Sequence, residues 1–82
     1  MSYVVFKGKK YYVENDKLKL NNLGIKDIDQ IEGLKDLANI KKLDLSYNKI
    51  ADINGLETLT NLKELNVSYN CISWFERLEN VP

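Results

Sequence analysis

Side chains that could act as nucleophiles, general bases or metal ligands are few in this sequence. It has no histidine among its 82 residues, which excludes histidine-dependent catalytic triads and zinc sites built from histidine and cysteine. The only cysteine, Cys71, lies between Asn70 and Ile72, and no base for it is identifiable. A thiol needs a base or an electropositive setting to act as a nucleophile. We therefore interpret Cys71 as an unpaired surface thiol and expect no enzymatic activity.

A second candidate for chemistry is the acidic run that contains Asp27, Asp29 and Glu32, whose oxygens could bind calcium. Its spacing is not that of a calcium-binding loop, and Ile28 and Ile31 within it are required in the core. The run is therefore interpreted as a solvated surface, and no metal or other cofactor is expected. The lone Gly8 between lysines is typical of a turn rather than of a phosphate-binding loop.

Twelve basic and twelve acidic residues cancel, so no global field favours nucleic acid or an anionic membrane. Nucleic-acid binding stays a minor alternative because five lysines lie among the first 20 residues, at positions 7, 9, 10, 17 and 19. The single cysteine and the lack of a signal-like or membrane-spanning run favour a cytoplasmic protein with no membrane partner. A repeat cut from a longer secreted protein would show the same features.

An internal repeat organises the second half of the chain. A shift of 22 residues places LDLSYNKI (43–50) on LNVSYNCI (65–72). The same shift superimposes seven apolar positions, which are 40, 43, 45, 50, 53, 56 and 59 in one copy and 62, 65, 67, 72, 75, 78 and 81 in the other. A fixed period of this length is typical of a solenoid, in which each unit stacks on its neighbours.

The spacing within each copy predicts a short strand followed by a sharp turn. Leu43 and Leu45 alternate with Asp44, as a strand with one buried face requires. Asn48 and Asn70 follow their strands at the point where backbone groups lose sheet partners, and an amide supplies both donors and an acceptor. We expect these two asparagines to be buried and structural. Asn39 and Asn61 are expected to form a second ladder.

The chain divides into one predicted domain over residues 1–82, with four parts. Residues 1–16 are expected to form a β-hairpin cap that covers the first strand's edge and the end of the apolar core. Residues 17–39 form an atypical first repeat, which is three residues longer and has Leu23 in place of the asparagine. Residues 40–61 form the second repeat, and residues 62–82 the third, which is expected to be uncapped.

The pattern L-x-L-x-x-N-x-I-x-x-I-x-G-L resembles the 22-residue class of leucine-rich repeats over about Leu18 to Val81. Phosphatase-1 regulatory subunits, bacterial internalins and many small intracellular adaptors share that class. The resemblance implies an α/β fold, a short right-handed solenoid with a parallel concave sheet of about three strands. It also implies that the concave sheet carries the contacts with a protein partner.

On that concave surface the register predicts four rows of side chains. The tyrosine row stands out because tyrosine supplies contact area at low entropic cost, although the two rings could also stack as a ladder between repeats. The rows are Lys17, Lys42 and Glu64; Lys19, Asp44 and Asn66; Asn21, Ser46 and Ser68; and Asn22, Tyr47 and Tyr69.

Two functions are compatible with these features. The first is a non-enzymatic protein–protein interaction module or adaptor that binds through the concave rows. The second is a structural unit that assembles with itself, as a homodimer through its C-terminal end. The uncovered apolar end would then comprise Val67, Trp74, Phe75, Leu78 and Val81, unless a cap lies beyond Pro82.

Overall fold

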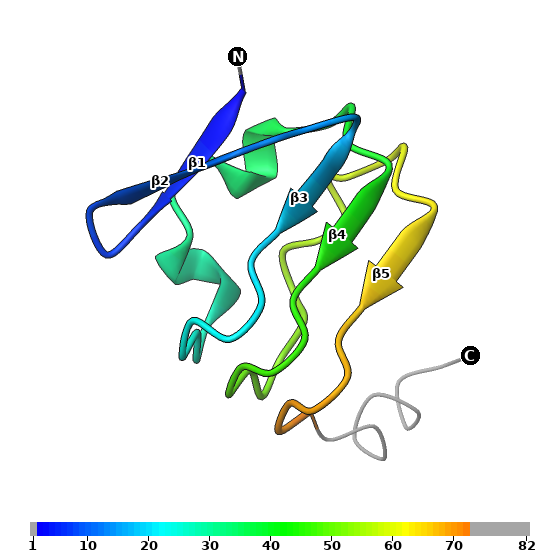
Figure 1. The fold of residues 1–82 in the computed structure, drawn as a ribbon. Coiled ribbons are helices and arrows are strands. Elements are labelled where there is room, and N and C mark those ends of the chain that lie inside the picture. Colours follow the sequence, from blue (N-terminus) through cyan, green and yellow to red (C-terminus); the bar gives the residue numbers. More distant parts are fainter. Residues whose placement is uncertain (1, 73–82) are drawn as a thin grey trace.

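The computed structural model describes residues 2–72, and Figure 1 shows how they are arranged. The chain forms two small sheets, and two short 3₁₀ helices lie between the first and second strands of the larger one. The elements are β1 (Tyr3–Phe6), β2 (Lys9–Tyr12), β3 (Lys17–Lys19), η1 (Ile28–Gln30), η2 (Leu34–Asp36), β4 (Lys42–Asp44) and β5 (Glu64–Asn66).

Strands β3, β4 and β5 form a parallel sheet in that order, and β1 pairs with β2 as an antiparallel hairpin (Figure 1). The register aligns Leu18, Leu43 and Leu65, as the repeat spacing predicts. Pairing continues past the strands, because the Tyr47 N–H donates to the Ser68 carbonyl at 2.9 Å. The predicted three-strand parallel sheet with an N-terminal hairpin is confirmed.

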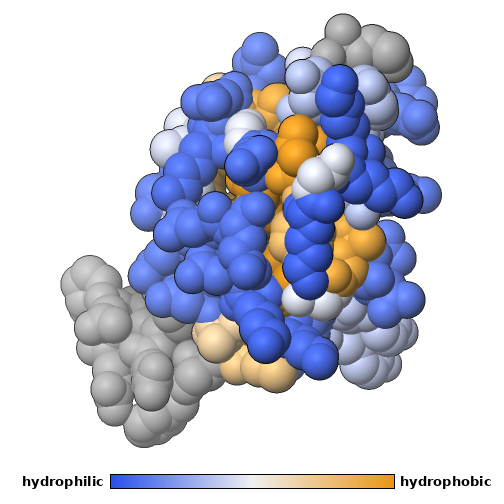
Figure 2. Space-filling view, turned by 90° about the vertical axis from the view of Figure 1, so that its left-hand side faces the viewer, coloured by the Kyte–Doolittle hydropathy of each residue, from blue (hydrophilic) through white to orange (hydrophobic). Residues whose placement is uncertain are grey.

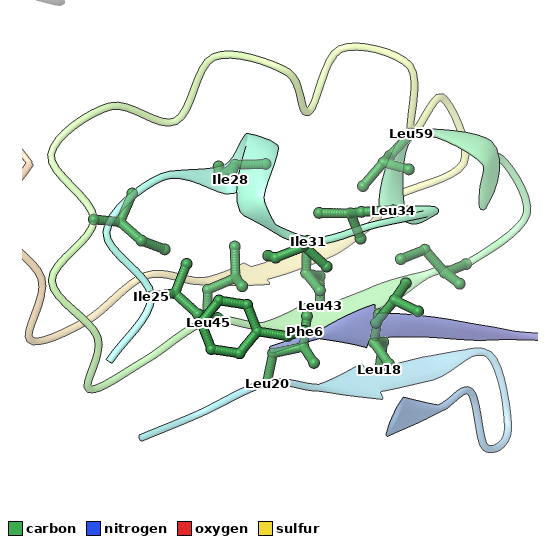
Figure 3. Close-up of a cluster of buried hydrophobic side chains, with 13 residues drawn as sticks. Phe6, Leu18, Leu20, Ile25, Ile28, Ile31, Leu34, Leu43, Leu45 and Leu59 are labelled. Atoms are coloured by element: carbon green, nitrogen blue, oxygen red, sulfur yellow. The ribbon is translucent and has the colours of Figure 1, made fainter. Parts of the chain in front are cut away.

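The core lies between the parallel sheet and the segments that return along its other side. Leu18, Leu20 and Leu45 are fully buried beneath the sheet, and Ile28 and Leu34 of the 3₁₀ helices face them. Alternate strand residues point into this core, and residues of the hairpin and of the returning segments complete it. Figure 3 shows the cluster, including Phe6, which reaches into it from β1.

The hairpin covers the end of the core by inserting Val4 and Phe6, whose exposures are 0% and 4%. Its two-residue turn has positive φ at Lys7 and at Gly8, which matches the twist of the flanking strands. Viewed from the hairpin end, hydrophilic side chains surround a stripe of hydrophobic ones (Figure 2).

The prediction that residues 1–16 also cover the edge of β3 holds at one position, where Glu14 and Lys17 bond to each other in both directions at 2.9 Å. Within residues 2–72, β1 and β2 form a separate sheet and make no ladder with β3. The outer edge of β1 instead pairs with the segment between the 3₁₀ helices, through Val5 N–H to the Glu32 carbonyl at 2.9 Å and Glu32 N–H to the Val5 carbonyl at 2.8 Å. The cap therefore joins the two sides of the first repeat and pairs with the edge of β3 only at Lys17.

Asp27 and Asp29 of the acidic run form contacts with residues that are close to them in the chain. Asp27 accepts the Asp29 N–H at 2.9 Å and begins η1, while the Gln30 amide oxygen accepts the Asp27 N–H at 3.2 Å. The Lys35 ammonium group lies 2.8 Å from the Asp29 carboxylate, and this hydrogen bond raises the pKa of Lys35. Ile28 and Ile31 are buried, as predicted. The inserted residues thus form a capped turn whose polar side chains are solvated.

At the opposite end of the sheet, β5 is the outermost strand of the described part of the chain. Leu65 is 39% exposed although its counterparts Leu18 and Leu43 are buried, because within residues 2–72 no further strand stacks against it. Val67 is half-buried. Trp74, Phe75, Leu78 and Val81, which were predicted to contribute to a self-association surface, lie outside the described residues. No helix within the described range is long and apolar enough to cross a membrane.

Candidate functional site

The parallel register brings the predicted rows of side chains together on the sheet. Lys17 is aligned with Lys42 and Glu64, and Lys19 with Asp44 and Asn66. The ammonium nitrogen of Lys42 lies 3.9 Å from a carboxylate oxygen of Glu64. Both side chains of that pair are largely exposed, so the attraction orients the groups but adds little stability.

Ser46 does not belong to the contact surface predicted for it. Its exposure is 5%, and its hydroxyl donates to the Asp44 carboxylate at 2.6 Å. The same carboxylate oxygen accepts the Ser46 N–H at 2.9 Å, so Asp44 is used to close the turn after β4. Ser68, one unit later, is exposed, and its N–H donates to the Asn66 side chain at 3.0 Å. Asp44 and Asn66 thus perform the same backbone role in successive units.

Tyr47 and Tyr69 form a stacked pair beyond the ends of β4 and β5. Their ring centroids are 4.5 Å apart, and the ring planes are inclined by only 9°. Both side chains are exposed, Tyr47 by 54% and Tyr69 by 72%. The pair is therefore an aromatic surface that remains largely accessible to solvent.

The backbone conformation of these tyrosines is unfavourable for a bulky residue. Both have φ 58°, in the left-handed region, and Asn22 in the same row of the first unit also has φ 58°. Asparagine tolerates this region, whereas a tyrosine in it costs about 1–2 kcal/mol. Two successive units thus place an aromatic residue where asparagine would fit with less strain.

Asn48 is buried below the turn, and its side chain connects two units. Its amide oxygen accepts the N–H groups of Leu23 and Ile25 at 2.9 and 3.1 Å. Its amide nitrogen donates to the carbonyl oxygens of Leu20 and Leu45 at 2.9 and 2.8 Å. A buried amide that satisfies this many backbone groups can stabilise both turns at once, and the size of that effect stays a prediction.

Asn70 repeats this arrangement one unit later. Its amide oxygen accepts the Ile50 N–H at 3.0 Å, and its nitrogen donates to the Leu45 carbonyl at 2.9 Å. Each of these asparagines therefore bonds to the unit before its own. This direction explains Leu23, because the first unit follows the hairpin and has no earlier turn to bond. The second ladder is also present, since the Asn61 amide donates to the Ala38 carbonyl at 3.1 Å and to the Asn39 side chain at 3.3 Å.

The structure has a second surface, at the β3 side of the sheet, that was not predicted from the sequence. Strand β2 and the start of the parallel sheet line a groove of ≈ 600 Å³. The hairpin supplies Lys9, Lys10, Tyr11, Tyr12, Glu14 and Asn15 to it, and the sheet supplies Lys17, Lys19 and Lys42. The cluster of lysines near the N-terminus was visible in the sequence, but the orientation of the hairpin was not.

Cys71 is exposed, and its backbone N–H donates to the Ile50 carbonyl at 2.9 Å. Over residues 2–72, no three or more Asp, Glu or Cys side chains are grouped so that they could hold a metal ion.

A search of curated proteins finds no match to this chain. A family model described as leucine-rich repeats, in two copies, matches residues 38–80. The matched range begins just before β4 and includes β5, both buried or half-buried asparagines and the stacked tyrosines. Together with the parallel register and the repeated asparagine contacts, this match shows that the chain belongs to the leucine-rich repeat family.

Proposed function

We propose that the chain is a non-enzymatic protein–protein interaction module, an adaptor that binds a protein partner through the concave face of its parallel sheet. Leucine-rich repeat domains generally act as protein-interaction modules. The observation that carries the proposal is the stacked pair of Tyr47 and Tyr69. The lone exposed cysteine is compatible with work in the reducing environment of the cytoplasm.

The tyrosine pair supports contact with a partner for an energetic reason. Its strained backbone lowers the stability of the free chain, and stacking between the two rings offsets part of that cost. Stacking uses only one face of each ring, and Tyr47 and Tyr69 remain 54% and 72% exposed. Aromatic side chains of this kind contribute strongly to protein interfaces because they bury a large area with few rotatable bonds.

The polar rows complete the proposed contact surface beside the tyrosines. Basic groups lie toward β3 and acidic or amide groups toward β5, so a partner would meet a gradient of charge across the sheet. Such a gradient favours one orientation of the partner over the reverse. The residues are Lys17, Lys19, Lys42, Asp44, Glu64, Asn66 and Ser68.

The proposal is tested by affinity capture with the wild-type chain and a Tyr47→Asn/Tyr69→Asn variant. Asparagine occupies the same row at position 22 with the same φ, so the variant is expected to fold. Tyr3→Ala, which removes an exposed tyrosine from the hairpin, is the control. A defined protein retained by wild type and by the control, but lost from the double variant, supports the proposal. Identical captured proteins for all three contradict it.

The alternative is a structural unit that dimerises through its C-terminal end. The exposed Leu65 on β5 favours it, and strand alternation directs the backbone groups of Leu65 and Val67 away from β4. An open strand edge beside apolar side chains is suited to pairing with a second copy. Light scattering behind a sizing column should then show a dimer that Leu65→Lys dissociates and Tyr3→Ser does not. A monomer at high concentration would exclude this alternative.

A further inference from the structure

The groove between the hairpin and the parallel sheet is strongly basic. Five lysines line it, at positions 9, 10, 17, 19 and 42, against the single carboxylate of Glu14. Of these lysines, only Lys42 forms an ion pair with another described residue. A concave surface lined by charges of one sign concentrates ligands of the opposite sign.

Aromatic rings form part of the same surface. The ammonium nitrogen of Lys9 lies 5.6 Å from the ring centroid of Tyr11, and both side chains line the groove. Tyr12, which is 47% exposed, lines the groove as well. The hydrocarbon stems of the lysines and these rings give the groove apolar walls under its charged groups.

Strand β3 presents an open backbone edge next to this groove. The N–H groups of Leu20 and Asn22 donate to carbonyls of the second unit, so alternation directs the backbone of Lys19 and Asn21 away from β4. Lys17, which also points away, is bonded to Glu14 in both directions at 2.9 Å. In the described chain the hairpin forms no ladder with β3, so the edge is closed at Lys17 and open from Lys19 onward.

We propose that this groove binds an extended acidic peptide segment of a protein partner. The peptide's carboxylates lie against the lysines, and its main chain bonds to the open edge of β3 at Lys19 and Asn21. Addition of a strand to an exposed edge supplies affinity through the main chain, while the side chains on alternate positions supply specificity. This inference rests on the proposed function, since it gives the partner's chemistry at one end of the concave face.

A peptide fits the groove better than a nucleic acid does. The chain has no net charge, so the five lysines act only at short range. The positive groups that line the groove are lysine ammonium groups. None of its lining residues is an arginine, whose guanidinium group could form paired bonds with phosphate. Its volume of ≈ 600 Å³ is suited to a few residues of extended chain.

The test is fluorescence anisotropy with a labelled peptide of five Glu-Thr repeats. The comparison probes are the neutral peptide of five Gln-Thr repeats and a thymidine hexanucleotide of similar charge. The groove variant is Lys17→Gln/Lys19→Gln. The matched control is Lys26→Gln/Lys49→Gln, which removes two exposed lysines that do not line the groove. Thermal melting of both variants verifies that they fold.

We expect the acidic peptide to bind wild type, and the groove variant to bind it about tenfold more weakly, since two exposed ion pairs are lost. The control should change affinity less than about twofold, and added salt should weaken binding. Equal binding of the neutral peptide, equal losses in both variants, or tighter binding of the oligonucleotide would overturn the inference.

The outcome is separable from that of the proposed function. Failure of the acidic peptide, together with capture of a partner that depends on Tyr47 and Tyr69, removes the groove assignment and leaves the adaptor role standing. Binding of the peptide without any tyrosine-dependent partner supports the groove assignment and contradicts the adaptor role that depends on Tyr47 and Tyr69.

Discussion

The side-chain amide of Asn48 donates a hydrogen bond of 2.9 Å to the carbonyl oxygen of Leu20, a residue 28 positions earlier in the chain. The two residues belong to successive units, so one side chain closes a turn that its own unit does not contain. A loss of this amide therefore affects two units.

We predict that Asn48→Ala lowers the free energy of unfolding by about 1–3 kcal/mol, because buried backbone groups of Leu20, Leu23 and Ile25 lose their partner. Chemical denaturation measures this change. Asn21→Ala, on the exposed face of the first unit, is the control and should change stability little. Equal destabilisation by the two substitutions would contradict the role assigned to the Asn48 amide.

The strained tyrosines lead to a second prediction. Tyr47→Asn should leave the melting temperature unchanged or raise it slightly, because relief of backbone strain opposes the loss of ring stacking. Tyr12→Asn, in an extended strand of the hairpin, offers no such relief and should lower it. Thermal unfolding followed by circular dichroism compares the two. A large loss of stability in Tyr47→Asn alone would mean that stacking outweighs the strain.

The hairpin is predicted to be essential for the stability of the repeats. Phe6→Ala should cost about 3–5 kcal/mol, since the ring is 4% exposed and its removal leaves a cavity at the end of the core. At about 0.05–0.15 kcal/mol per residue, that loss is a large fraction of the free energy of unfolding of a domain of this size. Phe6→Leu, which keeps most of the apolar volume, is the matched variant and should remain folded by circular dichroism. If Phe6→Ala unfolds at the same denaturant concentration as wild type, the cap is dispensable.

The turn formed by the extra residues of the first unit gives a fourth prediction. Asp27→Ala should cost about 0.5–2 kcal/mol, because the side chain accepts the Asp29 N–H at the start of η1. Lys26→Ala, the neighbouring exposed position, should have little effect. Urea unfolding of the two variants measures the difference. A similar midpoint for both would show that this turn is held by Ile28 and Ile31 alone.

Much of the fold could be predicted because the repeat spacing determines which residues are aligned across the sheet. Once Leu43 is placed over Leu65, the positions of Asp44 and Asn66 follow from strand alternation. The burial of Ser46 could not be predicted, since it depends on a turn that the Asp44 carboxylate closes. The hairpin's pairing with Glu32 was also missed, because the contact joins segments with no shared periodicity.

The same limit applies to the candidate surface. The alignment of Tyr47 with Tyr69 followed from the 22-residue shift, whereas their positive φ could not be predicted because tyrosine rarely adopts that conformation. The groove could not be predicted because it depends on the direction in which the hairpin lies relative to β3. No local pattern around Glu14 or Asn15 indicates that direction.

The asparagines that bond backwards also impose an order in time. Leu23 obtains its hydrogen-bond acceptor from a side chain 25 residues further along the chain. At about 5–20 residues per second, a ribosome exposes that acceptor on the order of 1–5 s after the turn itself has emerged. During this interval the first unit has its hairpin but an incomplete turn. Each new unit therefore completes the fold of the one before it, and the nascent chain matures in the direction of its own synthesis.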